Sequence, residues 1–167
     1  MTLSVKKNCP LAVSRDIFCA TGLVLLAAML GNYVTIPNIP SWYAHLSPPP
    51  LTPPNWLFGP VWTFLYALMA YAFFRILRLQ TTKTERLSAI AVFVLQLILN
   101  ASWSFAFFGA HNPLAGIFVI LPMEALILVA VFLFRKLDPV AGYCLVPYAA
   151  WVAFATYLNI GFWILNA

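Results

Sequence analysis

Five long apolar runs constrain this chain more than any other feature. They cover Ile17–Ile36, Trp56–Phe74, Leu87–Phe108, Pro113–Phe134 and Val140–Leu165. A helix needs roughly 20 residues to cross the hydrocarbon core of a bilayer, and each run supplies about that length. Because 63% of the 167 residues are hydrophobic and only 8% are charged, little sequence remains for a soluble domain. We therefore expect one all-α membrane domain over residues 1–167, built as a bundle of five transmembrane helices.

Basic residues gather in alternate connections of the predicted bundle. All nine precede the first run or lie in the second and fourth connections: Lys6, Lys7, Arg15, Arg75, Arg78, Lys83, Arg86, Arg135 and Lys136. In a five-helix bundle these places share one side of the membrane, and basic loops favour the cytoplasm. We expect a cytoplasmic N-terminus. The net charge of +5 then indicates contact with anionic headgroups, and we expect no nucleic-acid partner.

The remaining polar chemistry indicates neither a metal site nor a disulfide. The cysteines Cys9, Cys19 and Cys144 are odd in number and scattered along the chain. His45 and His111 share the predicted non-cytoplasmic side, but no carboxylate lies nearby in the sequence to orient a metal-bound ring. The first apolar run is too long for a usual signal peptide and no clean cleavage site follows it, so we expect a retained helix.

Aromatic and amide side chains form stripes on three predicted helices, at spacings of three and four residues. The stripes are Trp62, Tyr66, Met69 and Phe73; Gln96, Asn100, Trp103 and Phe107; and Tyr148, Trp151 or Val152, Ala155 and Asn159. Amides within a membrane usually hydrogen-bond neighbouring helices together, which is the simpler interpretation of each amide taken singly. Together, the three stripes predict a cavity for a flat, apolar ligand.

Tryptophans divide into two groups by their place in the runs. Trp42, Trp56 and Trp163 stand near the ends of runs, as in the aromatic belts at membrane interfaces. Trp103 and Trp151 lie deeper, where an indole N–H needs a partner or borders a cavity.

The order of these motifs resembles the TspO/MBR family, which comprises the translocator protein (the peripheral-type benzodiazepine receptor) and bacterial tryptophan-rich sensory proteins. The matching motifs are Trp42-Tyr43 with Leu46; Pro53-Pro54-x-Trp56; Trp62-x-x-Leu65-Tyr66-x-x-Met69; Gln96-Leu97-x-Leu99-Asn100-x-x-Trp103, followed by Phe107-Phe108-Gly109; and Pro147-Tyr148-x-x-Trp151-x-Ala153-Phe154-Ala155-Thr156-x-Leu158-Asn159. They run in order from about Gly31 to Asn159 and touch all five runs.

The resemblance implies a homodimeric receptor whose pocket opens toward the first connection and binds tetrapyrroles such as protoporphyrin IX. In animal members the ligands also include cholesterol and isoquinoline or benzodiazepine drugs. The expected ligand-binding residues are Trp42, Phe58, Gly59, Val61, Trp62, Asn100, Trp103, Tyr148, Trp151, Ala155 and Leu158. No cofactor is required, since the porphyrin is the ligand.

The resemblance leaves three roles open. The first is a sensor, sequestering or transport-assisting protein of a bacterial cell membrane, with a mitochondrial or bacterial outer membrane as the alternative location. The second is a light-dependent porphyrin-degrading enzyme, for which Trp62 and Trp151 are the candidate catalytic residues. The third is a cholesterol or lipid transporter. The animal sterol motif needs a Tyr and a basic residue after Leu158, and neither occurs there, which argues against sterol.

The first connection departs from the family pattern. Ser41–Trp56 reads SWYAHLSPPPLTPPNW, and Pro48–Leu51 stands where relatives usually have Lys-Pro-x-Trp. One tryptophan is therefore missing, and so is one cation that would neutralise a porphyrin propionate. Ala101 and Ala115 likewise replace tryptophans of relatives. Prolines make this connection stiff, so residues 37–55 are either a lid over the pocket or a structural spacer.

Glu124 is the one charged side chain near the middle of a predicted span, two residues after Pro122. An ionised carboxylate there would cost roughly 2.5–3.5 kcal/mol on the insertion scale for Asp, so we expect a protonated, hydrogen-bonded or polar-facing group. Two interpretations stay open. Glu124 is either functional or a structural contact, across a dimer interface or to a carbonyl freed by Pro122.

Overall fold

The structure, a computed structural model, describes residues 10–80 and 82–167, apart from the side chain of Lys83. The elements are α1 (Pro10–Ser41), a 3₁₀ turn η1 (Tyr43–His45), α2 (Asn55–Arg78), α3 (Lys83–Ser104), a π-helical turn η2 (Phe105–Gly109), α4 (Pro113–Leu137) and α5 (Pro139–Asn166). Within these described ranges, five helices are long and apolar enough to span a membrane. The expected all-α, five-helix membrane bundle is confirmed. Lys6, Lys7 and Cys9 lie outside the described residues.

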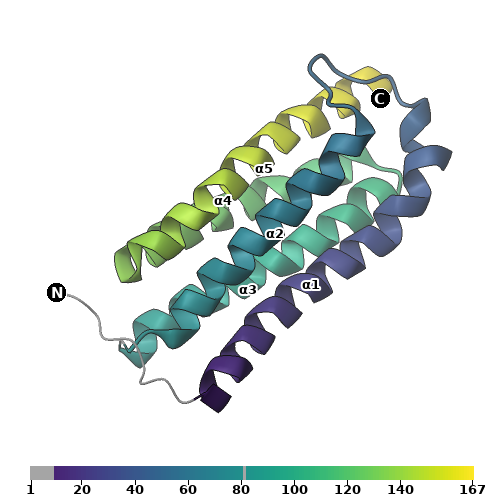
Figure 1. Cartoon of the computed structure of the whole chain (residues 1–167). Coiled ribbons are helices and arrows are strands. Elements are labelled where there is room, and N and C mark those ends of the chain that lie inside the picture. Colours follow the sequence, from purple (N-terminus) through teal and green to yellow (C-terminus); the bar gives the residue numbers. More distant parts are fainter. Residues whose placement is uncertain (1–9, 81) are drawn as a thin grey trace.

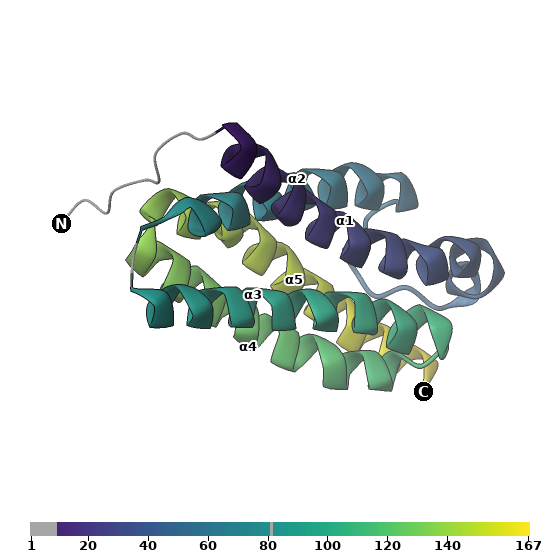
Figure 2. The ribbon, with the colours of Figure 1, turned by 90° about the horizontal axis from the view of Figure 1, so that it is seen from below.

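The five helices lie along a common axis, and successive helices run in opposite directions (Figure 1). α1 contacts α2 and α3, α2 contacts α5, and α3 contacts α4, which packs along α5. The start of α1 and the end of α5 therefore lie at opposite ends of the bundle, as the second view also shows (Figure 2). This order closes a ring of helices around a shared interior.

The interior near the α2–α3 and α4–α5 junctions is filled by stacked rings. Phe73, Phe93 and Phe134 come from α2, α3 and α4, with ring centroids 4.6 and 5.5 Å apart, and all three are buried. Such contacts contribute about 0.5–1.5 kcal/mol per pair beyond the burial of area. The interior of this half of the bundle is consequently filled by packed side chains.

Asp138 joins α4 to α5 at the same end. Its Oδ1 accepts hydrogen bonds from the backbone N–H groups of Val140 and Ala141, which caps α5, and Pro139 occupies the first helical position. Its Oδ2 accepts a 2.7 Å hydrogen bond from Nε of Arg75 on α2. The Asp138 carboxylate thus caps the start of α5 and connects the α4–α5 turn to α2.

The helices extend further than the apolar runs at most of their ends. The first helix begins at Pro10 instead of Ile17 and ends at Ser41 instead of Ile36. Its start carries Arg15 and Asp16, which bind each other, so charge there does not break the helix. At its end, Asn38 and Ser41 donate side-chain hydrogen bonds to carbonyls four residues earlier, within the segment that holds two prolines. The apolar runs do not include these terminal turns, because the turns contain polar residues and prolines. The helix continues through them beyond the apolar core of the membrane.

We predict that Asp138→Ala lowers the free energy of unfolding by about 2–4 kcal/mol, because it removes the α5 cap and leaves Arg75 without its carboxylate. Asp138→Asn should cost less, since the amide oxygen still caps the helix. The measurement is denaturant unfolding of the purified protein in detergent, followed by circular dichroism.

Lys136→Gln is the matched control at the same junction. Lys136 lies 3.7 Å from Glu85 in a pair whose side chains are both exposed, so its loss should cost less than about 0.5 kcal/mol. Equal destabilisation by Asp138→Ala and Lys136→Gln would contradict the role assigned to Asp138.

Candidate ligand-binding cavity

A cavity of about 470 Å³ lies between α1, α2, α3, η2 and α5, in the half of the bundle away from the Phe73 stack. This volume falls within the usual range for sites that hold small molecules. Eight of the predicted site residues line it: Phe58, Gly59, Trp62, Asn100, Trp103, Trp151, Ala155 and Leu158. Three others, Trp42, Val61 and Tyr148, do not.

One wall of the cavity is a continuous aromatic surface. The ring of Trp103 stacks on Phe107 with centroids 5.2 Å apart, and Phe107 meets Phe108 edge to face at 4.9 Å. The π-helical turn η2 adds a residue to the helical turn, and both Phe107 and Phe108 are buried. Two successive aromatic side chains therefore lie on the same wall of the cavity.

Asn159 fixes the orientation of the Trp103 ring. The indole N–H of Trp103 donates a 2.8 Å hydrogen bond to Oδ1 of Asn159, whose Nδ2 donates to the carbonyl of Pro113. Gly116 lies so close that an added Cβ would come within 2.7 Å of the same Oδ1. This amide therefore links α3, α4 and α5 while its partner Trp103 faces the cavity.

A chain of hydrogen bonds runs from the cavity into the core. The hydroxyl of Tyr66 donates to Oδ1 of Asn100 at 3.1 Å, and Nδ2 of Asn100 donates to the hydroxyl of Tyr148 at 3.2 Å. Tyr148 in turn donates to Oε1 of Gln96 at 2.9 Å, and Nε2 of Gln96 has no partner among the described residues. Tyr148 is fully buried, so it lies behind Tyr66 and Asn100 instead of lining the cavity.

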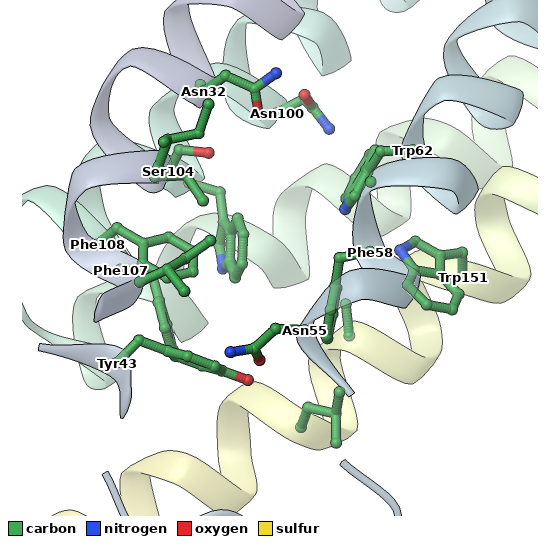
Figure 3. Close-up of a pocket in the computed structure, with 18 of the residues that line it drawn as sticks. Asn32, Tyr43, Asn55, Phe58, Trp62, Asn100, Ser104, Phe107, Phe108 and Trp151 are labelled. Carbon is green, nitrogen blue, oxygen red and sulfur yellow. The ribbon is translucent and has the colours of Figure 1, made fainter. Parts of the chain in front are cut away.

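The opposite wall is formed by aromatic side chains of α2 and α5. Trp62 stacks on Tyr66 with centroids 5.3 Å apart, and Phe58 meets Trp151 edge to face at 5.9 Å. Figure 3 shows the indole nitrogen of Trp62 directed into the cavity, and this N–H has no hydrogen-bond partner among the described residues. Trp151 Nε1 is buried and likewise lacks a partner in the described chain.

Helix α1 supplies a side of the cavity that the sequence stripes did not include. Asn32, Thr35, Ile36 and Ile39 line it, followed by Tyr43 of η1. Among them, Asn32, Ile36, Ile39 and Tyr43 follow one another at spacings of four, three and four residues, which is a fourth stripe. Asn32 within an apolar run is the signal that could have revealed it. Two of the lining residues, Ile36 of α1 and Trp56 of α2, are 63% and 72% exposed, so the cavity reaches the protein surface at these two helices.

Trp42 packs outside the aromatic wall and supports it. Its ring stacks on His111 at 4.8 Å and meets Phe107 edge to face at 5.4 Å. His111 has a positive φ of 51° and hydrogen-bonds Oδ1 of Asn38. The tryptophan, the histidine and the end of α1 thus form a layer behind the cavity wall.

The proline-rich connection lies against α5. The Ser47 N–H donates to Oδ1 of Asn166, whose Nδ2 donates back to the Ser47 carbonyl, and the hydroxyl of Tyr157 donates to the Pro50 carbonyl. Pro49 is buried against Gly161. Residues 46–54 do not line the cavity, whereas Ile39, Tyr43 and Asn55 from the proposed lid do. Closure of residues 37–55 over a ligand stays a prediction.

Charge is excluded from the cavity within the described part of the chain, since no Lys, Arg, Asp or Glu lines it. Glu124 on α4 is partly buried outside the lining, and its Oε2 has no hydrogen-bond partner among the described residues. The site therefore offers aromatic faces together with uncharged hydroxyl, amide and indole groups. Such a surface suits binding of a planar molecule.

Comparison with known proteins agrees with the resemblance expected from the motifs. A sequence model of the TspO/MBR family matches residues 20–164. The tryptophan-rich protein TspO of Chlorobaculum tepidum is 39% identical over 87% of this chain and 92% of its own length. The tryptophan-rich sensory protein of Cereibacter sphaeroides is 34% identical over 75% and 77%, and the human translocator protein is 33% identical over 73% of each chain.

The contact between Pro49 and Gly161 makes a prediction about the connection. In Gly161→Ala the new Cβ would stand within 2.5 Å of Pro49 Cβ, so the connection must move away from α5. The Ser47 amide then loses its bond to Asn166 and should exchange with solvent about tenfold faster in hydrogen exchange followed by mass spectrometry.

Gly22→Ala is the control, because an added Cβ there meets no atom within 4 Å. Both substitutions replace a helical glycine and bring the same gain in helix propensity, about 1 kcal/mol. Exchange of Ser47 at the wild-type rate in Gly161→Ala would show that this contact does not hold the connection in place.

Proposed function

Because the chain belongs to the TspO/MBR family, we propose that it binds a tetrapyrrole of the protoporphyrin IX kind in the cavity between α1, α2, α3 and α5. In this role it is a multi-pass membrane protein that senses, sequesters or helps to move its ligand. The N-terminus is cytoplasmic in this proposal, since the described basic residues lie at the end of the bundle where α1 begins. The homodimer stays a prediction from the resemblance.

The observation that carries the proposal is the pair of aromatic walls. Trp103 and Phe107 face the cavity from α3 and η2, and Trp62 and Phe58 face it from α2. A macrocycle presents two π-faces, and stacking against aromatic rings adds about 0.5–1.5 kcal/mol per contact to the burial of area. A smaller apolar ligand would use one wall, whereas a large planar ring uses both.

The opening between α1 and α2 supports a ligand that partitions into membranes. Ile36 and Trp56 border it on the sides of the two helices, where a bilayer would lie. Hydrophobic planar molecules concentrate in the bilayer, so they reach such an opening without crossing water. This favours a membrane-dissolved ligand over a soluble metabolite.

The test is a titration of the purified protein in detergent with protoporphyrin IX in the dark, followed by tryptophan fluorescence and porphyrin absorbance. We expect saturable quenching. Trp62→Leu should raise Kd by about fivefold to tenfold, because it removes a ring and an N–H that face the ligand. Trp163→Leu removes an indole outside the cavity lining and should leave Kd within about twofold.

Absence of saturable quenching in the wild-type protein would overturn the proposal, and equal losses in Trp62→Leu and Trp163→Leu would place the ligand elsewhere. Illumination of the complex then separates binding from breakdown. A stable porphyrin absorbance band supports a binding protein, whereas light-dependent loss of the band that Trp62→Phe together with Trp151→Phe abolishes would support the enzymatic alternative.

A further inference from the structure

The polar groups that face the cavity are all uncharged. They include the indole N–H of Trp62, the hydroxyls of Tyr43 and Ser104, and the side-chain amides of Asn32 and Asn55. None of these groups has a hydrogen-bond partner in the described part of the chain, so each can serve a ligand. Donors and acceptors of this kind suit carbonyl, ester, amide or ring-nitrogen groups.

Cations of the described chain lie too far away to act on the cavity. Arg75 follows Asn55 by 20 residues on α2, which is about 30 Å of helix. Arg86 precedes Asn100 by 14 residues on α3, about 21 Å, and Arg15 precedes Asn32 by 17 residues on α1, about 25 Å. Physiological salt screens charges in water over about 8 Å. A ligand carboxylate would therefore meet no positive partner at the cavity among the described residues.

The two histidines at this end of the bundle do not change that conclusion. Neither lines the cavity: His45 is exposed on η1, and His111 stacks beneath Trp42 with its Nε2 hydrogen-bonded to Asn38. His111 stacks on Trp42, and it is Trp42 that contacts Phe107 of the cavity wall.

Two effects in this cavity oppose the binding of an anionic ligand. Its carboxylates leave water for a site bordered by lipid and aromatic rings, and they gain no ion pair there to offset the lost hydration. An uncharged substituent loses far less hydration and can accept a hydrogen bond from Trp62 or Asn55. The same planar ring should thus bind better when its side chains carry no charge.

We infer that this cavity selects uncharged planar ligands and discriminates against the dicarboxylate form of the same ring. The inference rests on the proposed function, because it names the ligand class of that site. The chemical class is a large conjugated ring with ester, amide or alkyl substituents, taken from the bilayer between α1 and α2. Asn55 and Trp62 are the residues that recognise its uncharged acceptors.

The test compares protoporphyrin IX with its dimethyl ester, which differ in charge and share the ring. Both are titrated at the same pH, about 8, at which free carboxyl groups are ionised, into the full-length protein in nanodiscs of zwitterionic lipid. Empty nanodiscs supply the partition correction. In the wild-type protein we expect the ester to bind at least about tenfold more tightly than the diacid.

A single added cation isolates the effect of charge. Asn55→Lys places an ammonium group at the cavity opening, so the ratio of diacid Kd to ester Kd should fall by about threefold or more. Leu165→Lys adds the same charge at the same end of the bundle on an exposed residue outside the cavity lining, and should leave the ratio unchanged.

The outcomes separate this inference from the function on which it rests. If the diacid binds as tightly as the ester or more tightly, the inference fails and the proposed function stands. The inference is also contradicted if Asn55→Lys and Leu165→Lys change the ratio of diacid Kd to ester Kd equally. The effect would then come from the net charge of the protein and not from a charge at the cavity. If neither porphyrin saturates the protein, the proposed function fails, and the inference fails with it.

Discussion

Within a bilayer, buried polar groups must be satisfied by the protein, and the rest of this structure depends on that constraint. The backbone satisfies itself by forming helices, so the side-chain amides are left to find partners on other helices. Asn159 does so with Trp103 and Pro113, while Asn100 joins Tyr66 to Tyr148. These bonds set the relative positions of α2, α3, α4 and α5.

The cavity exists where this network ends. On the side of the network away from the cavity, the rings of Phe73, Phe93 and Phe134 fill the interior. On the cavity side of the network, α1 contributes small and polar residues such as Gly31 and Asn32. These side chains do not fill the space between α2 and α3. Hydrogen-bonded side chains thus form one boundary of the cavity, and aromatic rings form its walls.

The first connection acts on the cavity indirectly in this structure. Its prolines and Ser47 are held by Gly161, Tyr157 and Asn166 on the outer side of α5. The cavity is lined by other residues of the same helix, namely Leu158, Asn159 and Phe162. The connection therefore braces one wall, and the stiffness of its prolines lowers the entropy lost when it packs.

Sequence by itself determined the number of spanning helices, the family and most of the cavity residues on α2, α3 and α5, because hydrophobic length and three-to-four spacing are local properties. It could not place Tyr148 behind Asn100 or Trp42 behind Phe107, since a stripe shows which residues share a face and not which neighbour that face meets. The π-helical turn that holds Phe107 and Phe108 packs against α1 and α4, and no spacing in the sequence indicated it. Only the tertiary structure decided these points, because they depend on how far apart the helices stand and which polar groups they pair.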